Sequence, residues 1–362
     1  MKNCAYIAEV FLPNTSAYST HTLKMCDNLS KKFDNCELFI INSIKKTSYK
    51  DIRNKYLFTS KKKFKITNVT NFMKTINFYE RLIFGYSVAK ILKKKKTDLI
   101  ITRSFMASFF LCLYDIKHFL EIHHTLKGFT KFIFLDLNFI NSKSIKSIIF
   151  ISKKLSQNFK VKKKLILHDA IDPNNFPKNK KVSKIKNIGY IGSLLEGRGI
   201  DTIEKLSIMN PDLNFFIIGK KIKDKKYLIS SKNLKVLNFV EYSKVPNLLF
   251  KFDVLLMPYK KIVNVNSFNL NTADYCSPLK MFDYLASGKA IISSKLDGIN
   301  EVLKNNINSL LVEGDNIHKW NKALQKLRNN KYLVNKITTN ALITATQYTW
   351  SKRIKKIIKV NY

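Results

Sequence analysis

The stretch DYCSPLKMFDYLASGKAIIS, residues 274–293, predicts a short helix that leads directly into a strand. Ser277 is a preferred residue for the position that caps a helix, and Pro278 suits the first helical position, where the N–H that proline lacks has no partner. Gly288 suits the left-handed conformation that ends a helix. Residues 290–293 then predict a strand. A helix joined this closely to a strand is typical of proteins in which helices alternate with parallel strands.

Lys280 and Asp283 are three residues apart in this helix, so an ammonium and a carboxylate lie side by side on one face. Lys280 falls in the first turn, where free backbone N–H groups also attract anions. One interpretation is a phosphate site whose carboxylate accepts hydrogen bonds from neutral hydroxyls, a combination that fits a nucleoside diphosphate carrying a sugar. The other is a structural helix that buries Leu279, Phe282 and Leu285 and carries a surface ion pair. Both interpretations are equally compatible with the stretch alone.

The same alternation of strands and helices extends over the whole chain. Its 362 residues, 45% of them hydrophobic, are enough for two domains that each bury a core. The pattern predicts α/β domains in which helices wrap parallel sheets. Predicted strands lie at 4–12, 36–41, 98–102, 119–123, 147–151, 165–168, 188–192, 214–218, 234–239, 253–258, 290–293 and 309–312. Predicted helices include 78–92, 129–139, 200–209, 300–303, 317–327 and the amphipathic tail 349–360, whereas 42–75 shows no clear period and predicts irregular structure with at most one strand.

The domain boundary is predicted from a loss of hydrophobic pattern. Prolines, asparagines and charges follow His168, and residues 178–186 are rich in lysine, which is typical of a linker. The predicted organisation is therefore a first domain over 1–177, a linker over 178–186 and a second domain over 187–345. Residues 346–362 form a final helix that is expected to pack back on the first domain.

The charge of the chain is strongly positive, because 65 Lys and Arg face 25 Asp and Glu for a formal net charge of +40. Three explanations compete: a compositional bias toward Lys, Asn and Ile, adhesion to an anionic membrane, and nucleic-acid binding. The basic runs 61–63, 93–96 and 162–164 are scattered, and none lies in a recognisable nucleic-acid-binding module. Compositional bias with some contribution from a membrane surface is the favoured interpretation, and no specific nucleic acid is expected as a partner.

Five cysteines occur without a CxxC pair or regular spacing, which favours a reducing compartment: Cys4, Cys26, Cys36, Cys112 and Cys276. No metal site is predicted, because His123 and His124 point to opposite faces of a strand.

The longest apolar run, 105–114, is far shorter than the roughly 20 residues of a membrane span. Residues 4–12 predict a buried strand rather than a signal peptide. A soluble or peripheral protein is therefore expected.

Two segments of the first domain place polar residues where strands end. Alternation along 119–123 sends Glu121 and His123 to one face at the carboxyl end of the strand, where open α/β folds bind ligands. The polar loop 13–22 follows the first strand at the same edge. A functional histidine at this edge is one interpretation of His123, and a histidine that hydrogen-bonds a neighbouring loop is the other.

In the second domain a glycine-rich turn follows the strand 188–192. Gly192, Gly197 and Gly199 allow the backbone to turn sharply into the helix 200–209, and Arg198 stands near its N-terminus. Glycines between a strand and a helix often serve only close packing, so this turn alone is a weak indication of a phosphate loop.

Taken in order, these features resemble the retaining glycosyltransferases of family 4, which have the GT-B fold of two Rossmann-like domains facing across a cleft. The resemblance covers nearly the whole chain. On the donor side it rests on GYIGS at 189–193, GRGID at 197–201, FFIIG at 215–219, the opening stretch and NEVL at 300–303. On the acceptor side it rests on 13–22, EIH at 121–123 and HDAID at 168–172.

The resemblance implies roles for individual residues of the donor domain. Arg198 and Lys280 would bind the donor diphosphate and stabilise charge on the leaving group, while Asp283, the second acid of the family's paired-acid motif, would hold the ribose. That acid is usually Glu, and the first acid of the pair falls on Tyr275, with Asp274 one residue out of register. The group that contacts the transferred sugar is therefore expected among four neighbours: Asp274, Tyr275, Cys276 and Ser277. Gly192 and Ser193 would line the donor at the glycine turn.

On the acceptor side the resemblance implies that His123 lies near the anomeric carbon and that Glu121 belongs to the acceptor side of the site. Ser16 and Ala17 occupy the loop that often carries glycines in the family, so the approach to the sugar is expected to differ here. No metal or other cofactor is implied, because arginine and lysine can stabilise the leaving diphosphate by themselves.

The predicted function is a metal-independent, retaining hexosyltransferase that uses a nucleoside diphosphate sugar and a surface-glycan or lipid-linked acceptor. It would act in the cytoplasm or on the inner face of the membrane. The alternatives are a nucleotide-sugar epimerase of the same fold, an inactive homologue and a basic nucleic-acid-binding protein.

Overall fold

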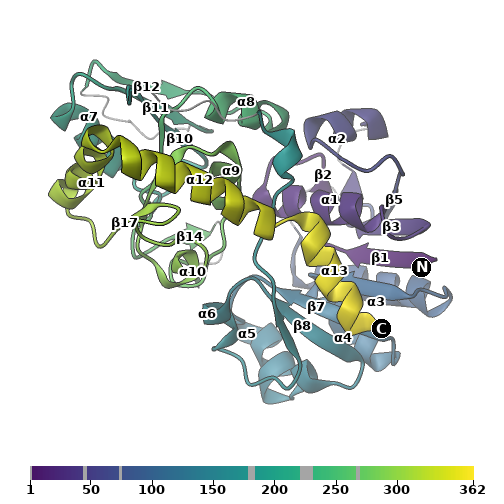
Figure 1. Ribbon diagram of the computed structural model, residues 1–362. Coiled ribbons are helices and arrows are strands. Elements are labelled where there is room, and N and C mark those ends of the chain that lie inside the picture. Colours follow the sequence, from purple (N-terminus) through teal and green to yellow (C-terminus); the bar gives the residue numbers. More distant parts are fainter. Residues whose placement is uncertain (1, 44–46, 73–75, 178–183, 221–230, 266–269) are drawn as a thin grey trace. The chain divides into compact units, whose positions relative to one another are not determined.

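The computed structural model describes residues 2–43, 47–72, 76–177, 184–220, 231–265 and 270–362. They form two compact units. Unit 1 comprises residues 1–151, 155–168 and 350–362, and unit 2 comprises residues 152–154 and 169–349. Figure 1 shows the elements of both units.

The boundary between the units differs from the predicted one at 177. Unit 2 already begins at Asp169, whose N–H donates to Ser277 Oγ at 3.2 Å. The Ile171 N–H then donates to the Tyr348 carbonyl at 2.9 Å, and Ile171 forms a β-bridge with Thr349. The segment 169–177 is attached to unit 2 by these hydrogen bonds and by the side chains of Ile171 and Phe176, which are buried in the core of that unit. Of the predicted linker, residues 178–183 lie outside the described part of the chain.

Unit 1 is built on a seven-stranded parallel sheet in the order β5-β3-β1-β6-β7-β8-β9. Its strands are β1 (Asn3–Ile7), β3 (Asn35–Ile40), β5 (Lys65–Asn68), β6 (Leu99–Thr102), β7 (His118–Ile122), β8 (Ile145–Phe150) and β9 (Lys164–Ile166), and β2 (Phe11–Leu12) pairs separately with β4 (Asn42–Ser43). Its helices are α1 (Ala17–Leu29), α2 (Tyr49–Lys55), α3 (Phe78–Lys93), α4 (Phe105–Leu113), α5 (Gly128–Lys131), the π-helix η1 (Phe132–Asp136), the 3₁₀-helix η2 (Phe139–Asn141) and α13 (Trp350–Asn361), with α6 (Lys153–Ser156) at the boundary.

The pair α3 and α4 shows how the sequence fixes this unit. A capping box starts α3, since Asn77 Oδ1 accepts from the Glu80 N–H while the Glu80 carboxylate accepts from the Asn77 N–H. A Cβ on Gly85 would lie only 2.6 Å from the Met106 backbone, so glycine permits the close approach of α4. The apolar faces of both helices join one core with β1, β3 and β6.

Unit 2 has a six-stranded parallel sheet in the order β12-β11-β10-β13-β16-β17. Its strands are β10 (Asn187–Ile191), β11 (Asn214–Ile218), β12 (Leu234–Leu237), β13 (Val254–Met257), β16 (Ala290–Ser294) and β17 (Leu310–Val312), and β14 (Asn264–Val265) pairs with β15 (Leu270–Asn271). Its helices are α7 (Ile200–Met209), α8 (Val245–Leu249), α9 (Leu279–Ser287), α10 (Asp297–Asn300), α11 (Ile317–Asn329) and α12 (Lys331–Gln347), with the short 3₁₀-helices η3 (Pro173–Asn175) and η4 (Tyr242–Lys244).

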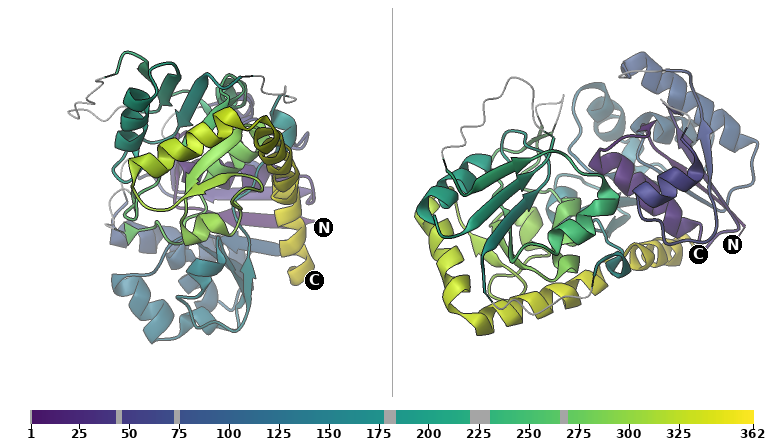
Figure 2. Two further views of the ribbon diagram at one scale, coloured as in Figure 1. Left: turned by 60° about the vertical axis from the view of Figure 1, so that its left-hand side comes forward. Right: turned by 90° about the horizontal axis from the view of Figure 1, so that it is seen from above.

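Both faces of this sheet are covered by helices, as the right-hand view of Figure 2 shows for the teal and green strands. In β13, Val254 and Leu256 join a core with α7 and α11, whereas Leu255 and Met257 join a second core with α8 and α9. Strands buried on both faces are apolar throughout, which explains the continuous hydrophobic runs of the sequence. If the six strands are numbered 1 to 6 along the chain, their order across the sheet is 3-2-1-4-5-6, which is the strand order of the Rossmann fold.

The predicted α/β fold with two parallel sheets is confirmed, and several elements differ. The segment 42–75 contains β4, α2 and β5 among its described residues, rather than irregular structure. The predicted helix 129–139 is divided into α5, η1 and η2, the predicted helix 300–303 is replaced by α10, and α12 was not predicted. Among the helices that the structure describes, none has both the length and the apolar character needed to cross a bilayer.

Candidate functional site

The candidate donor site lies at the point in unit 2 where the order of the strands reverses. The chain runs outward from β10 to β11 and β12, then returns to β13 on the other side of β10. Ligands of open α/β sheets bind at the carboxyl ends of two such strands. Gly192 follows β10 there, and Tyr259 follows β13 by two residues.

The start of α9 differs from the prediction. The helix begins at Leu279 and Pro278 occupies its cap position, without a side-chain cap. Ser277 is buried, and its hydroxyl accepts from the Asp169 N–H instead of capping the helix. The end is as predicted, since Gly288 has φ 63° in the left-handed region.

Lys280 lies in an aromatic enclosure without an anion. Its Nζ is 4.0 Å from the centre of the Tyr190 ring and 5.3 Å from that of Tyr259. The Nζ atom is buried and has no hydrogen-bond partner among the residues that the structure describes. Burial, followed by repulsion from Arg198, lowers the pKa of the Lys280 ammonium well below its ordinary value. The predicted alternative of a surface ion pair with Asp283 therefore does not describe this lysine.

Arg198 is the second cation of the same enclosure. Its guanidinium carbon lies 4.8 Å from the centre of the Tyr259 ring. Its Nε is buried, and the described part of the chain offers it no hydrogen-bond partner. A buried polar atom without a partner costs free energy of about 1–3 kcal/mol, and more for a charged group. Two such cations beside each other make a site for an anion, because an anion would satisfy both.

The glycines of this region are required by close contacts. A Cβ on Gly192 would lie 2.1 Å from Lys280 Nζ, and a Cβ on Gly199 would lie 1.7 Å from the Pro258 carbonyl oxygen. Gly199 also has φ 70° where it caps α7. Ser193 is exposed, and its carbonyl accepts from the Tyr190 hydroxyl at 2.6 Å. The glycine turn thus leaves room for the lysine side chain.

Asp283 is buried on α9 and accepts a hydrogen bond from the Tyr242 hydroxyl at 2.9 Å. Tyr242 comes from η4, so the carboxylate is oriented by a residue about 40 positions away in the chain. Sequence patterns gave no indication of Tyr242, because no local spacing connects the two residues.

The residues before α9 have different environments. Asp274 is exposed, whereas the Tyr275 hydroxyl is buried and has no hydrogen-bond partner in the described ranges of the chain. Ser152 Oγ donates to the Tyr275 carbonyl at 2.8 Å. Burial raises the pKa of the Cys276 thiol to about 12, so this cysteine is a neutral thiol at physiological pH. The acid of this segment faces solvent, and its tyrosine points inward.

Unit 1 contains a second cluster of functional groups, centred on Glu121 of β7. Its carboxylate is fully buried and lies within hydrogen-bond distance of four side chains. Oε1 contacts His21 Nε2 and His123 Nε2, both at 2.8 Å, and Arg353 Nη2 at 2.6 Å. Tyr6 donates to Oε2 at 2.9 Å. Glu121 therefore fixes the orientation of His123, which follows β7 by one residue.

The electrostatics of this cluster favour a charged carboxylate and a neutral His123. Although burial opposes the charge, His21 and Arg353 hold the pKa of Glu121 well below its usual range. Burial and the Arg103 charge lower the pKa of His123 to about 3. Because a carboxylate only accepts hydrogen bonds, the neutral His123 carries its proton on Nε2 and leaves Nδ1 without a proton.

The ligand atoms of His21, Glu121 and His123 all lie within 4.8 Å of one another, which is close enough to hold a metal ion. The Arg353 guanidinium contacts the same carboxylate oxygen and would repel a cation there. Because Arg353 already neutralises the Glu121 carboxylate, these residues fit an ion-paired hydrogen-bond network better than they fit a metal centre.

The other predicted residues of unit 1 lie at the start of α1. Ser16 caps this helix, because its Oγ accepts from the Ser19 N–H at 3.1 Å, and Ala17 is the first helical residue. Both are exposed or nearly so. Nearby, the Arg103 guanidinium stacks 3.9 Å from the Tyr18 ring centre, an interaction that the sequence did not indicate.

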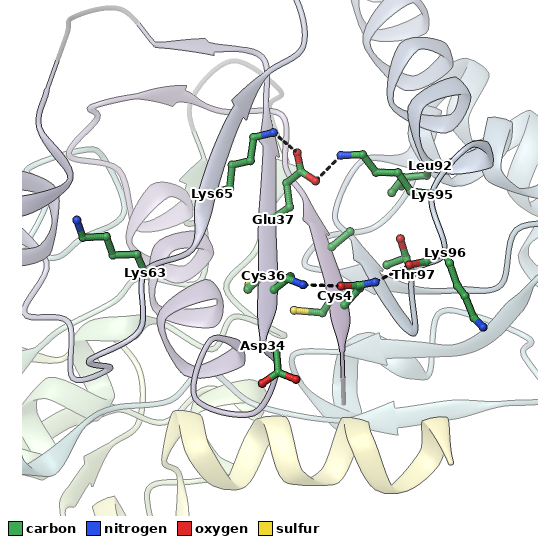
Figure 3. Close-up of a pocket in the computed structure, with 13 residues that line it drawn as sticks. Cys4, Asp34, Cys36, Glu37, Lys63, Lys65, Leu92, Lys95, Lys96 and Thr97 are labelled. Carbon is green, nitrogen blue, oxygen red and sulfur yellow. Dashed lines mark hydrogen bonds and ion pairs between the residues drawn. The ribbon is translucent and has the colours of Figure 1, made fainter.

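A pocket of about 510 Å³ lies elsewhere in unit 1, at the amino ends of β1 and β3. Figure 3 shows Glu37 between Lys65 and Lys95, with distances of 3.5 and 2.7 Å, and Cys4 beside Cys36. Within the pocket the Glu37 carboxylate is thus paired with two lysines. The pocket contains none of the predicted site residues, which lie toward the carboxyl ends of strands.

This fold of two parallel-sheet units is the fold of GT-B glycosyltransferases. Residues 171–343 match the model of the family described as glycosyl transferases group 1.

Similar proteins extend over nearly the full length of the chain. An uncharacterized glycosyltransferase of Methanocaldococcus jannaschii is 20% identical over 97% of this chain and 95% of its own. HepE of Anabaena, solved in complex with UDP and glucose, matches 99% of both chains with a TM-score of 0.73 and 11% identity. WaaG, a glycosyltransferase involved in lipopolysaccharide biosynthesis, matches 99% of both chains with a TM-score of 0.67 and 13% identity.

Proposed function

We propose that this protein is a metal-independent, retaining hexosyltransferase that uses a nucleoside diphosphate sugar as donor. The observation that carries the proposal is a pair of buried cationic atoms, Lys280 Nζ and Arg198 Nε, at the carboxyl edge of the unit 2 sheet. Neither atom has a hydrogen-bond partner among the described residues. A diphosphate supplies the oxygen acceptors that both lack. The family match of residues 171–343 and the UDP in the HepE complex support this donor class.

The chemistry follows from where charge develops. When the bond between sugar and diphosphate breaks, positive charge grows at the anomeric carbon and negative charge grows on the departing phosphate. Lys280 and Arg198 are already in place, so they stabilise the departing charge without reorganisation. Asp283, oriented by Tyr242, accepts hydrogen bonds from the hydroxyls of the ribose. Two fixed cations can supply this stabilisation without a metal.

On the acceptor side, the proposal assigns His123 to the position near the anomeric carbon. A neutral imidazole held by Glu121 can accept a hydrogen bond at Nδ1 from a sugar hydroxyl. Ser16 and Ala17, at the exposed start of α1, would contact the acceptor or the sugar. The proposed acceptor is a cell-surface glycan or a lipid-linked sugar, a class suggested by the similarity to WaaG. The proposed location is the cytoplasm, including the inner face of the membrane.

A thermal-shift screen tests the donor site. Purified protein is heated with UDP, GDP, ADP, CMP and their common sugar conjugates, and the screen is repeated on Lys280→Ala, Asp283→Ala and the exposed control Lys205→Ala. A ligand at 100 times its Kd stabilises the folded state by about 2.7 kcal/mol. We expect one nucleoside diphosphate to raise the melting temperature, less so in the two site variants and equally in the control.

The same experiment separates the alternatives. No stabilisation by any nucleotide would contradict the proposal and favour an inactive homologue. Donor binding followed by epimerisation without an acceptor would identify an epimerase. Strong, salt-dependent binding to nucleic acid without nucleotide binding would favour the charge-driven alternative.

A further inference from the structure

One face of α3 in unit 1 exposes apolar side chains to solvent. Tyr79, Ile83 and Tyr86 are 73%, 52% and 42% exposed. They are followed by the exposed Lys90 and Lys93, and the five residues are separated by four, three, four and three positions. This spacing places all five on one side of the helix. The opposite side carries the buried residues that pack against α4 and the sheet, so the exposed stripe is additional to the core.

Aromatic contacts extend this stripe onto a neighbouring element. The ring of Phe78, at the start of α3, lies 5.0 Å from that of Phe129 in α5, and Phe129 lies 6.3 Å from Phe132 in η1. All three rings are exposed to solvent. We call this surface the aromatic face, defined by Phe78, Tyr79, Ile83, Tyr86, Phe129 and Phe132. Contiguous exposed apolar surface of this kind marks an interaction site.

The charges around the aromatic face are mainly basic. Lys90, Lys93 and Lys94 lie at the end of α3, and Lys131 lies at the end of α5; all four are exposed. The acidic residue of α3 is Glu80, and its carboxylate is used to cap the helix, because it accepts a hydrogen bond from the Asn77 N–H at 2.6 Å. Aromatic and aliphatic side chains bordered by lysines suit the interface between headgroups and acyl chains of an anionic bilayer.

We propose that the aromatic face docks unit 1 onto an anionic lipid bilayer. Tyr79, Ile83 and Phe132 enter the interfacial region of the bilayer, and Lys90 and Lys93 contact the anionic headgroups. A second copy of this chain fits less well as the occupant, because it would bring the same lysines to a contact between chains of net charge +40. The inference does not rest on the proposed enzymatic activity, since the residues of the face belong to neither candidate cluster.

Vesicle sedimentation tests this surface. The full chain is mixed with phosphatidylcholine vesicles that contain either 30% phosphatidylglycerol or none, where 30% is a chosen composition of roughly physiological charge. The test variants are Ile83→Glu with Phe132→Glu, and Lys90→Gln with Lys93→Gln. The matched control is Ile208→Glu with Ile343→Glu, two isoleucines of unit 2 that are 55% and 52% exposed. Melting curves verify that each variant is folded.

We expect the wild type and the control to bind the anionic vesicles, with binding weakened by salt. Each lysine near an anionic surface contributes about fivefold in partition, so the double lysine variant should bind about 30-fold more weakly. The glutamate variant should lose at least tenfold. Equal binding of all variants, or equal binding to neutral vesicles, would overturn the proposal. A stable dimer that only the glutamate variant dissociates, without vesicle binding by the wild type, would identify self-association instead.

Discussion

Replacing Arg353 by methionine is expected to destabilise unit 1 strongly. Arg353 is buried on α13, and its guanidinium contacts Glu121 Oε1 at 2.6 Å and donates to the Leu167 and His168 carbonyls. Methionine removes these donors and leaves a buried carboxylate without its cation. Breaking a buried ion pair in this way costs about 3–5 kcal/mol. A unit of this size loses about 2–4 °C of melting temperature per kcal/mol, so we expect a decrease of about 6–20 °C.

Calorimetry of the purified chain measures this decrease, and two further variants show its cause. Lys356→Met removes an exposed cation from the same helix and should change the melting temperature by no more than about 2 °C. In the double variant Arg353→Met with Glu121→Gln, no charge is left unpaired, so at least half of the lost stability should return. The reasoning is refuted if Arg353→Met has the same melting temperature as the Lys356→Met control, or if the double variant is the least stable of all. In either case the buried ion pair does not stabilise the packing of α13.

Three other predictions concern single groups. Lys280 has a lowered pKa in the free protein and would gain a diphosphate as partner, so donor binding at a pH above that lowered pKa should take up a proton. Calorimetric titration over a range of pH, in buffers of different ionisation enthalpy, measures this uptake, and Lys280→Met should abolish it. Gly192→Ala places a methyl group against the Lys280 ammonium and should weaken donor binding about tenfold, because overpacking costs about 1–3 kcal/mol. An unchanged affinity would contradict the close contact between residue 192 and the Lys280 side chain. His123 has a pKa of about 3 in the folded protein, so as the pH falls the unfolded chain binds a proton at this residue before the folded protein does. The stability that the neutral imidazole contributes should therefore be lost from about pH 6.5 toward pH 3. His123→Gln should flatten the profile of melting temperature against pH over that range.

The fold was largely predictable because its sheets are buried on both faces. Strands such as β11 and β13 are apolar runs that no other element of this length explains, and their alternation with helices determines the parallel topology. The segment containing α2 and β5 was not predicted, since its few buried side chains are spaced irregularly along a basic sequence. The long helix α12 escaped prediction because its buried face includes Thr338, Ala341 and Ala345, which give no strong apolar stripe.

The candidate donor site was more predictable than its surroundings. Lys280, Asp283 and Arg198 belong to short motifs with a fixed spacing, so the sequence alone was enough to propose them as candidates. Tyr190 and Tyr259, which enclose the Lys280 ammonium, come from the ends of two different strands and acquire their role only through the fold. The same holds for Tyr242 beside Asp283. The predicted capping role of Ser277 was wrong, because its hydroxyl accepts a hydrogen bond from the N–H of Asp169, a residue from a distant segment.

The two clusters differ in what their charges lack, and this difference indicates how each one works. In unit 1 the buried Glu121 is surrounded by donors from β1, α1 and α13, so its charge is satisfied before any ligand arrives and serves to hold His123 in one orientation. In unit 2 the Lys280 Nζ and Arg198 Nε atoms are buried beside aromatic rings, and no described residue supplies either atom with a hydrogen-bond acceptor. This arrangement is unfavourable until a ligand supplies an anion. A satisfied network contributes rigidity, whereas an unsatisfied one gives its free energy to binding. The cations should therefore govern donor affinity, and the network around Glu121 should govern the geometry of transfer.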